Sequence, residues 1–142
     1  MDKTEYQEKL DAAGLTLVAK KPEDPLYILA DGRRLWRVFD NLMNNVCKYS
    51  QPGTRVYLTL EKQGGDAVFT FRNTSREELM ERFVRGDSSR STEGSGLGLS
   101  IARSFTELQN GKMELDIDGD LFKVILRFAA LENKIAVCSL LL

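Results

Sequence analysis

The chain has 142 residues, of which 42% are hydrophobic and 29% are charged, with 20 Lys and Arg against 21 Asp and Glu. This composition is typical of a single globular domain, and a net charge of −1 argues against bulk nucleic-acid binding, which needs a strongly basic face. The sequence contains no histidine, which excludes every Ser-His-Asp or Cys-His mechanism, every His-ligated metal and a phosphohistidine on this chain.

The first half of the chain contains one long helical pattern after two short strands. Residues 2–14 are polar and weakly helical, and residues 15–19 and 26–30 predict strands separated by a proline-containing turn. Asp31 is suited to cap a helix that runs to about Ser50, because apolar residues recur there at helical spacing: Leu35, Val38, Phe39, Leu42, Met43 and Val46. Residues 51–53 end this helix.

The second half alternates hairpins with one more helix. Residues 55–61 and 67–72 predict a hairpin, and the polar stretch 73–96 contains one short helical piece around residues 77–84. A helix is predicted from residue 97 or 98 to residues 110–111, burying Leu97, Ile101, Phe105 and Leu108. A final hairpin joins residues 113–117 to residues 122–128, with an apolar inner face of Phe122, Val124, Leu126 and Phe128.

The order of these elements predicts an α+β fold. Because the strands come as hairpins rather than as βαβ units, we expect a mixed, mostly antiparallel sheet with the helices on one face, a two-layer α/β sandwich. The domain is expected to span residues 15–128. Residues 1–14 are expected to be a linker from an upstream domain, and residues 129–142 a C-terminal tail to which we assign no role.

One side of the long helix carries a concentrated set of polar residues. Opposite the apolar stripe, within about a third of the circumference, lie Arg37, Asn41, Asn44, Asn45 and Lys48. Asparagine is a poor interior helix former, costing a few tenths of a kcal/mol against alanine. Two interpretations stay open: a solvated face, or a face whose amide oxygens coordinate a hard cation such as Mg²⁺. In the second, Lys48 meets a phosphate and Tyr49 stacks on a nucleobase.

Two further segments suit an anionic ligand. The run Gly94-Ser95-Gly96-Leu97-Gly98 directly precedes a predicted helix, where glycine permits close backbone approach and the helix N-terminus favours negative charge. It matches neither a phosphate-binding loop of the Walker type nor a dinucleotide fingerprint. Residues 81–90 form either a surface loop or a source of arginines, Arg85 and Arg90, for the same phosphate.

Together these segments resemble three sequence boxes of sensor histidine kinases. The segment DNLMNNVCKYS (40–50) is similar to the N box, ERFVRGDSSR (81–90) to the F box and EGSGLGLSIA (93–102) to the G2 box. The resemblance covers about residues 15–128. It identifies the chain as an ATP-binding catalytic domain of the GHKL type, with the Bergerat ATP-binding fold and without the dimerisation domain that carries the phosphoacceptor.

This resemblance implies a site for ATP and Mg²⁺. It makes Asn45 the Mg²⁺ ligand with Asn41 beside it, and it places Lys48 at a phosphate, so that these three form the catalytic group. Tyr49 would flank the base. The remaining implied nucleotide contacts come from the lid and from the glycine-rich cradle: Arg85, Arg90, Gly94, Ser95, Gly96, Leu97 and Gly98.

The sequence departs from the family pattern at the G1 box. A D-x-G-x-G motif is expected after the strand that ends near Arg72, but the chain has Asn73-Thr74-Ser75-Arg76-Glu77. Asn73 stands where an aspartate reads the adenine amino group. Its amide oxygen still accepts a hydrogen bond, with a stabilisation smaller by about 1 kcal/mol. Leu121 stands where the family often has a threonine.

The resemblance implies transfer of the γ-phosphate of ATP to a histidine on a separate dimerisation domain, because this chain has none. The implied partners are that domain and a response regulator, with no nucleic acid and no membrane insertion by this fragment. The expected location is the cytoplasm, with the parent protein anchored in the cell membrane. Two alternatives stay open: a degenerate, non-catalytic nucleotide-binding or protein-interaction module, and a stand-alone protein-serine kinase of the same superfamily.

Overall fold

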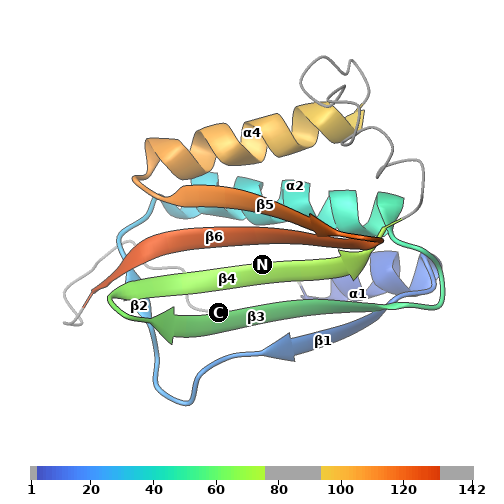
Figure 1. Cartoon of the computed structure of the whole chain (residues 1–142), viewed down its shortest axis with the longest axis horizontal. Coiled ribbons are helices and arrows are strands. Elements are labelled where there is room, and N and C mark those ends of the chain that lie inside the picture. The colour runs from blue at the N-terminus through green and yellow to red at the C-terminus, as the bar shows by residue number, and fades with distance from the viewer. Residues whose placement is uncertain (1–2, 76–93, 132–142) are drawn as a thin grey trace.

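A curved sheet with helices against one of its faces forms the molecule (Figure 1). The computed structural model describes residues 3–75 and 94–131. Its helices are α1 (Lys3–Ala12), α2 (Gly32–Tyr49) and α4 (Gly94–Leu108). Its strands are β1 (Thr16–Lys20), β2 (Tyr27–Ile28), β3 (Arg55–Gln63), β4 (Asp66–Thr74), β5 (Lys112–Asp118) and β6 (Leu121–Leu131). Within these ranges, no helix is long and apolar enough to cross a bilayer.

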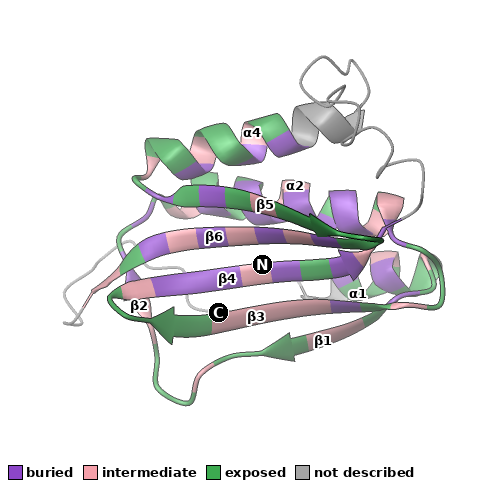
Figure 2. Cartoon of the chain, in the orientation of Figure 1, coloured by how far each residue is buried: buried purple, intermediate pink, exposed green. Residues whose placement is uncertain are grey.

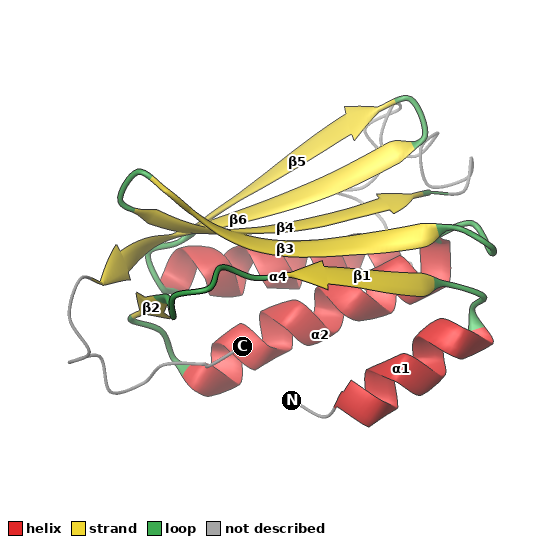
Figure 3. Ribbon diagram, turned by 90° about the horizontal axis from the view of Figure 1, so that it is seen from below, coloured by secondary structure: helices red, strands yellow, loops and turns green. Residues whose placement is uncertain are grey.

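The sheet is mixed, and its strands follow the order β1-β3-β4-β6-β2, with β5 also paired to β6. Only the β1–β3 pair is parallel among the pairs of the described strands, and the other pairs are antiparallel. Seen from the side, all three helices lie on the same face of the sheet (Figure 3). The predicted α+β class, with a mostly antiparallel sheet and helices on one face, is therefore confirmed.

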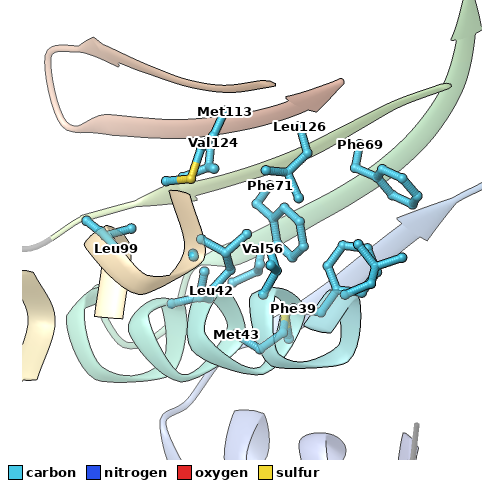
Figure 4. Packing of buried hydrophobic residues seen from close by; sticks show 14 of the residues in the cluster. Phe39, Leu42, Met43, Val56, Phe69, Phe71, Leu99, Met113, Val124 and Leu126 are labelled. Atoms are coloured by element: carbon cyan, nitrogen blue, oxygen red, sulfur yellow. The ribbon is translucent and has the colours of Figure 1, made fainter. Parts of the chain in front are cut away.

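The core forms where α2 lies across the sheet. Asp31 caps the helix by accepting hydrogen bonds from the backbone N–H groups of Arg33 and Arg34. The ring of Phe39 lies 5.1 Å from the ring of Phe69 and 5.7 Å from that of Phe71, measured between centroids. Figures 2 and 4 show this buried layer between α2 and the sheet. The whole predicted stripe of α2 is buried: Leu35, Val38, Phe39, Leu42, Met43 and Val46.

The β5–β6 hairpin matches its predicted inner face and extends its predicted length. Phe122, Val124, Leu126 and Phe128 are all at most 3% exposed. β6 continues to Leu131, three residues beyond the predicted end, because Ala130 and Leu131 pair with β2. The extension draws the first residues of the expected tail into the sheet.

Helix α4 differs from its prediction in both its start and its buried face. It begins at Gly94, so the glycine-rich run lies inside its first turns. Leu108, predicted to be buried, is 63% exposed, whereas Leu99, Ala102 and Thr106 are buried. The Thr106 hydroxyl donates to the carbonyl oxygen of Ala102 at 2.7 Å. A satisfied hydroxyl and a small alanine suit the close contact between α4 and α2.

Replacing Gly111 by alanine tests the packing after α4. An added Cβ would lie 2.5 Å from Cε1 of Phe128, a buried ring that cannot move freely. We expect Gly111→Ala to lower the free energy of unfolding by about 1–3 kcal/mol, measured by urea denaturation. Gly65→Ala is the control, because nothing lies within 4 Å of its Cβ position. Equal stability of both variants would contradict this packing.

Candidate functional site

Asn41 and Asn45 form a polar line one turn apart on α2. Asn45 is 8% exposed, and its Oδ1 is buried without a hydrogen-bond partner. The Nδ2 of Asn41 is buried and unpartnered in the same way. In the described ranges these are the two buried side-chain polar atoms without a partner, and each costs about 1–3 kcal/mol of desolvation. The amide oxygen is a hard ligand of the kind that Mg²⁺ prefers, so Asn45 fits the expected ion.

Asp40 and Asn44 face α1 and lie apart from this line. The hydroxyl of Tyr6 donates to Oδ1 of Asp40 at 2.5 Å, and Nζ of Lys9 donates to Oδ1 of Asn44 at 3.1 Å. Cys47 lies on the same side, and burial raises the pKa of its thiol while Lys9 opposes that rise. The polar residues of α2 therefore form two groups. Asp40 and Asn44 contact α1, whereas Asn41 and Asn45 have buried side-chain atoms without a hydrogen-bond partner.

The last turn of α2 presents a cation and an aromatic ring together. Lys48 is exposed, and its Nζ lies 5.3 Å from the centroid of the Tyr49 ring. Tyr49 is half-buried and packs against the edge of the hydrophobic core. The structure thus brings both residues to the C-terminal end of α2, one turn beyond Asn45, where a phosphate and a flat base would find a positive charge and a ring face.

At the end of β4, a buried polar cluster joins the strand to the end of α2. Nδ2 of Asn73 donates to Oγ of Ser50 at 2.7 Å and to Oγ of Ser75 at 3.3 Å. All three side chains are at most 3% exposed. Ser50 and Ser75 also form an isolated β-bridge, and the N–H of Gln51 donates to the carbonyl oxygen of Thr74 at 2.9 Å. These contacts fix Asn73 beside the helix end.

The family pattern points to Asn73 but not to its two serine partners, Ser50 and Ser75. Ser75 is recognisable in hindsight, since it follows Asn73 by two residues and alternation places both on one face of an extended chain. Ser50 lies 23 positions before Asn73, and only the tertiary fold brings the two together. Leu121, expected near the base, is the first residue of β6, pairs with Thr74 and is 39% exposed.

The N-terminus of α4 lies at the same end of the molecule as the C-terminus of α2 (Figure 1). The opposite ends also meet, since the N–H of Asp31 donates to Oε1 of Gln109 at 2.8 Å. The glycine-rich run, predicted to precede a helix that starts at residue 97 or 98, is itself helical, because α4 includes Gly94, Ser95, Gly96, Leu97 and Gly98. The first N–H groups of a helix are unpaired, so glycine here still offers bare donors to an anion. Arg85 and Arg90 lie outside the described residues.

Comparison with known proteins agrees with this arrangement. The sequence profile of the family described as "Histidine kinase-, DNA gyrase B-, and HSP90-like ATPase" matches residues 30–130. The probable sensor protein PcoS of Escherichia coli is 34% identical over 130 residues, which cover 84% of this chain and 27% of PcoS. The chain thus spans about a quarter of the length of that relative.

Solved structures share the fold. The catalytic domain of histidine kinase ThkA superposes with a TM-score of 0.71 at 23% identity, covering 89% of this chain and 86% of that one. Full-length ShkA in complex with AMPPNP gives a TM-score of 0.68 at 23% identity, covering 90% of this chain and 28% of ShkA. The match to the family profile and these likenesses lead to one conclusion: the chain belongs to the family of histidine kinase-, DNA gyrase B- and HSP90-like ATPases.

Proposed function

We propose that the chain is the ATP-binding catalytic domain of a two-component sensor histidine kinase, which presents the γ-phosphate of ATP to a histidine on a separate dimerisation domain. The observation that carries the proposal is the buried Oδ1 of Asn45, an oxygen that has no hydrogen-bond partner within the described residues. Family membership supports it, as does AMPPNP in the complex of ShkA, which shares the fold.

Each described residue of the site has a distinct task. Asn45 holds Mg²⁺ through Oδ1, and Asn41 lies beside it to orient a ligand or a metal-bound water. Bound Mg²⁺ supplies positive charge that neutralises the phosphate oxygens. Lys48 leaves the Tyr49 ring to bind a phosphate, Tyr49 covers one face of the base, and Asn73 hydrogen-bonds its edge. The first N–H groups of α4 cradle phosphate oxygens.

The transfer itself relies on positioning rather than on covalent work by this chain. The accepting imidazole is the nucleophile that attacks the γ-phosphorus, and ADP leaves as the bond to the β-phosphate oxygen breaks. Since the chain contains no histidine, the acceptor belongs to another domain or another chain. The partners we propose are the dimerisation domain of the parent protein and a response regulator, with the parent anchored in the cell membrane and this domain in the cytoplasm.

A second candidate is a nucleotide-binding module without turnover. The observation that favours it is Asn73-Thr74-Ser75 at the end of β4, where the family pattern has an aspartate and glycines. This alternative retains binding through Asn45 and lacks phosphotransfer. The two candidates therefore differ in one measurable step.

The unpartnered oxygen of Asn45 leads to a contrast in stability. Asn45→Ala removes a buried, unpaired polar atom and improves helix propensity, so we expect a free energy of unfolding equal to or above that of the wild type. Asn73→Ala removes two hydrogen bonds and leaves two buried hydroxyls, so we expect a loss of about 1–3 kcal/mol. Urea denaturation measures both. If Asn45→Ala lost as much as Asn73→Ala, Asn45 would be a structural residue.

Calorimetric titration with ATP tests the metal ligand. With Mg²⁺ present we expect Asn45→Ala to weaken ATP binding by at least about tenfold, and this difference to vanish in EDTA. Asn44→Ala is a matched control on the same helix, because Asn44 is exposed and faces α1. An unchanged affinity of Asn45→Ala with Mg²⁺ present would remove Asn45 from the site.

Phosphotransfer separates the two candidates. The isolated dimerisation domain of the parent protein is incubated with γ-labelled ATP and this chain, and label on its histidine is measured. We expect labelling with the wild type and a strong reduction with Asn45→Ala, because Asn45 positions the phosphates through the metal. Reactions without this chain serve as the blank. Nucleotide binding without any label would favour the non-catalytic module.

A further inference from the structure

The buried cluster of Asn73, Ser50 and Ser75 is composed entirely of neutral groups that both donate and accept hydrogen bonds. A serine hydroxyl has one donor hydrogen and two acceptor lone pairs, and it rotates to suit its partner. An asparagine amide has a donor side and an acceptor side of nearly the same size and shape. Every member of the cluster is therefore able to reverse its hydrogen-bonding role, the serines by rotating the hydroxyl hydrogen and the asparagine by turning its amide.

Two orientations of the Asn73 amide satisfy both serines. In the first, Nδ2 donates to Oγ of Ser50 at 2.7 Å and to Oγ of Ser75 at 3.3 Å, and Oδ1 stands outside these two hydrogen bonds. In the second, the amide is turned by 180°, Oδ1 accepts from the same two hydroxyls and Nδ2 stands outside. The number of hydrogen bonds to the serines is the same in both orientations. The two serines therefore impose little preference as to whether Oδ1, an acceptor, or Nδ2, a donor, is left to face a ligand.

A carboxylate at this position lacks that freedom. Ionised aspartate is an acceptor on both oxygens, so the oxygen that stands outside the serine pair always accepts. This carboxylate oxygen accepts a hydrogen bond from an amino group of a ligand and repels the lone pairs of a keto group. A site that reads one hydrogen-bonding group discriminates strongly, because the wrong ligand leaves polar groups unpaired.

We infer that Asn73, together with Ser50 and Ser75, gives the site a relaxed choice of purine, so that it binds nucleoside triphosphates with either an amino or a keto group at position 6 of the ring. Adenine donates its amino hydrogen to Oδ1, and hypoxanthine or guanine accepts at its keto oxygen from Nδ2. This inference rests on the proposed function, because it assumes that the base lies against Asn73.

Two described residues beside this cluster, Tyr49 and Leu121, add no selectivity for position 6 of the purine. Tyr49, one residue before Ser50, offers a ring face, and ring faces stack on any base. Leu121, which pairs with Thr74, offers an apolar side chain that carries no hydrogen-bonding group. Gln51 also contacts the cluster, but its Nε2 is engaged by the carbonyl oxygen of Ser75 at 3.2 Å. Among these residues, Asn73 is therefore the side chain that we expect to read the edge of the base.

The experiment compares ATP, ITP and GTP, each with Mg²⁺, by calorimetric titration of the full chain. ITP is the decisive probe, because its base differs from adenine at position 6 without the added 2-amino group of guanine. We expect the dissociation constants of ATP and ITP to lie within about tenfold of each other. Asn73→Asp should raise the preference for ATP over ITP by at least about tenfold, since its carboxylate accepts from both serines and cannot donate to the base.

Gln63→Glu is the matched control, because it makes the same amide-to-carboxylate change at the opposite end of the β3–β4 hairpin. It should leave the ratio of ATP to ITP affinity unchanged. The wild-type ratio is decisive even if Asn73→Asp does not fold. ATP binding with a preference over ITP above about tenfold, or an unchanged ratio in folded Asn73→Asp, would overturn the inference and leave the proposed function intact. Failure to bind any triphosphate would overturn both.

Discussion

The placement of α2 on the sheet is the constraint on which the rest of the structure depends. The helix buries a continuous apolar stripe, and Phe39 locks its rotation by packing against Phe69 and Phe71. Once the rotation of α2 about its axis is fixed, the helical repeat places Asn41 and Asn45 at one edge of the buried stripe. There Nδ2 of Asn41 and Oδ1 of Asn45 are buried from water and have no hydrogen-bond partner. The same dispersion and hydrophobic forces that stabilise the core therefore keep the Oδ1 of Asn45, the Mg²⁺ ligand that we propose, out of contact with water and without a competing hydrogen bond.

Polar contacts at both ends and along one side of α2 oppose any movement of this helix. Asp31 and Gln109 join its start to the end of α4, while Ser50 and Asn73 join its end to β4. Along its side, α1 contributes Tyr6 and Lys9. Such rigid support is what a site built from a few neutral side chains needs, because amide ligands gain little from charge and depend on being held in position.

The sequence predicts this fold well wherever a pattern is unambiguous. The stripe of α2 has one solution, and the inner face of β6 alternates strictly, so both are correct. Helix α4 has two possible apolar faces. Packing against α2 buries the face with Leu99 and Ala102 and leaves Leu108 exposed, and the local sequence pattern does not show where α2 lies. In the same way, the division of the asparagines depends on where α1 lies, and Ser50 meets Asn73 only through β4. The local sequence pattern does not determine which residues distant along the chain contact each other.

The neutral composition of the cluster at the end of β4 has a consequence for proton linkage. A buried carboxylate in its place would take up a proton at low pH, and the free energy of unfolding would then change with pH through that group. Asn73, Ser50 and Ser75 have no proton to gain or lose in the physiological range, so the junction between α2 and the sheet holds equally in mildly acidic and neutral surroundings. This junction therefore adds no pH dependence of its own to the support of the candidate nucleotide site.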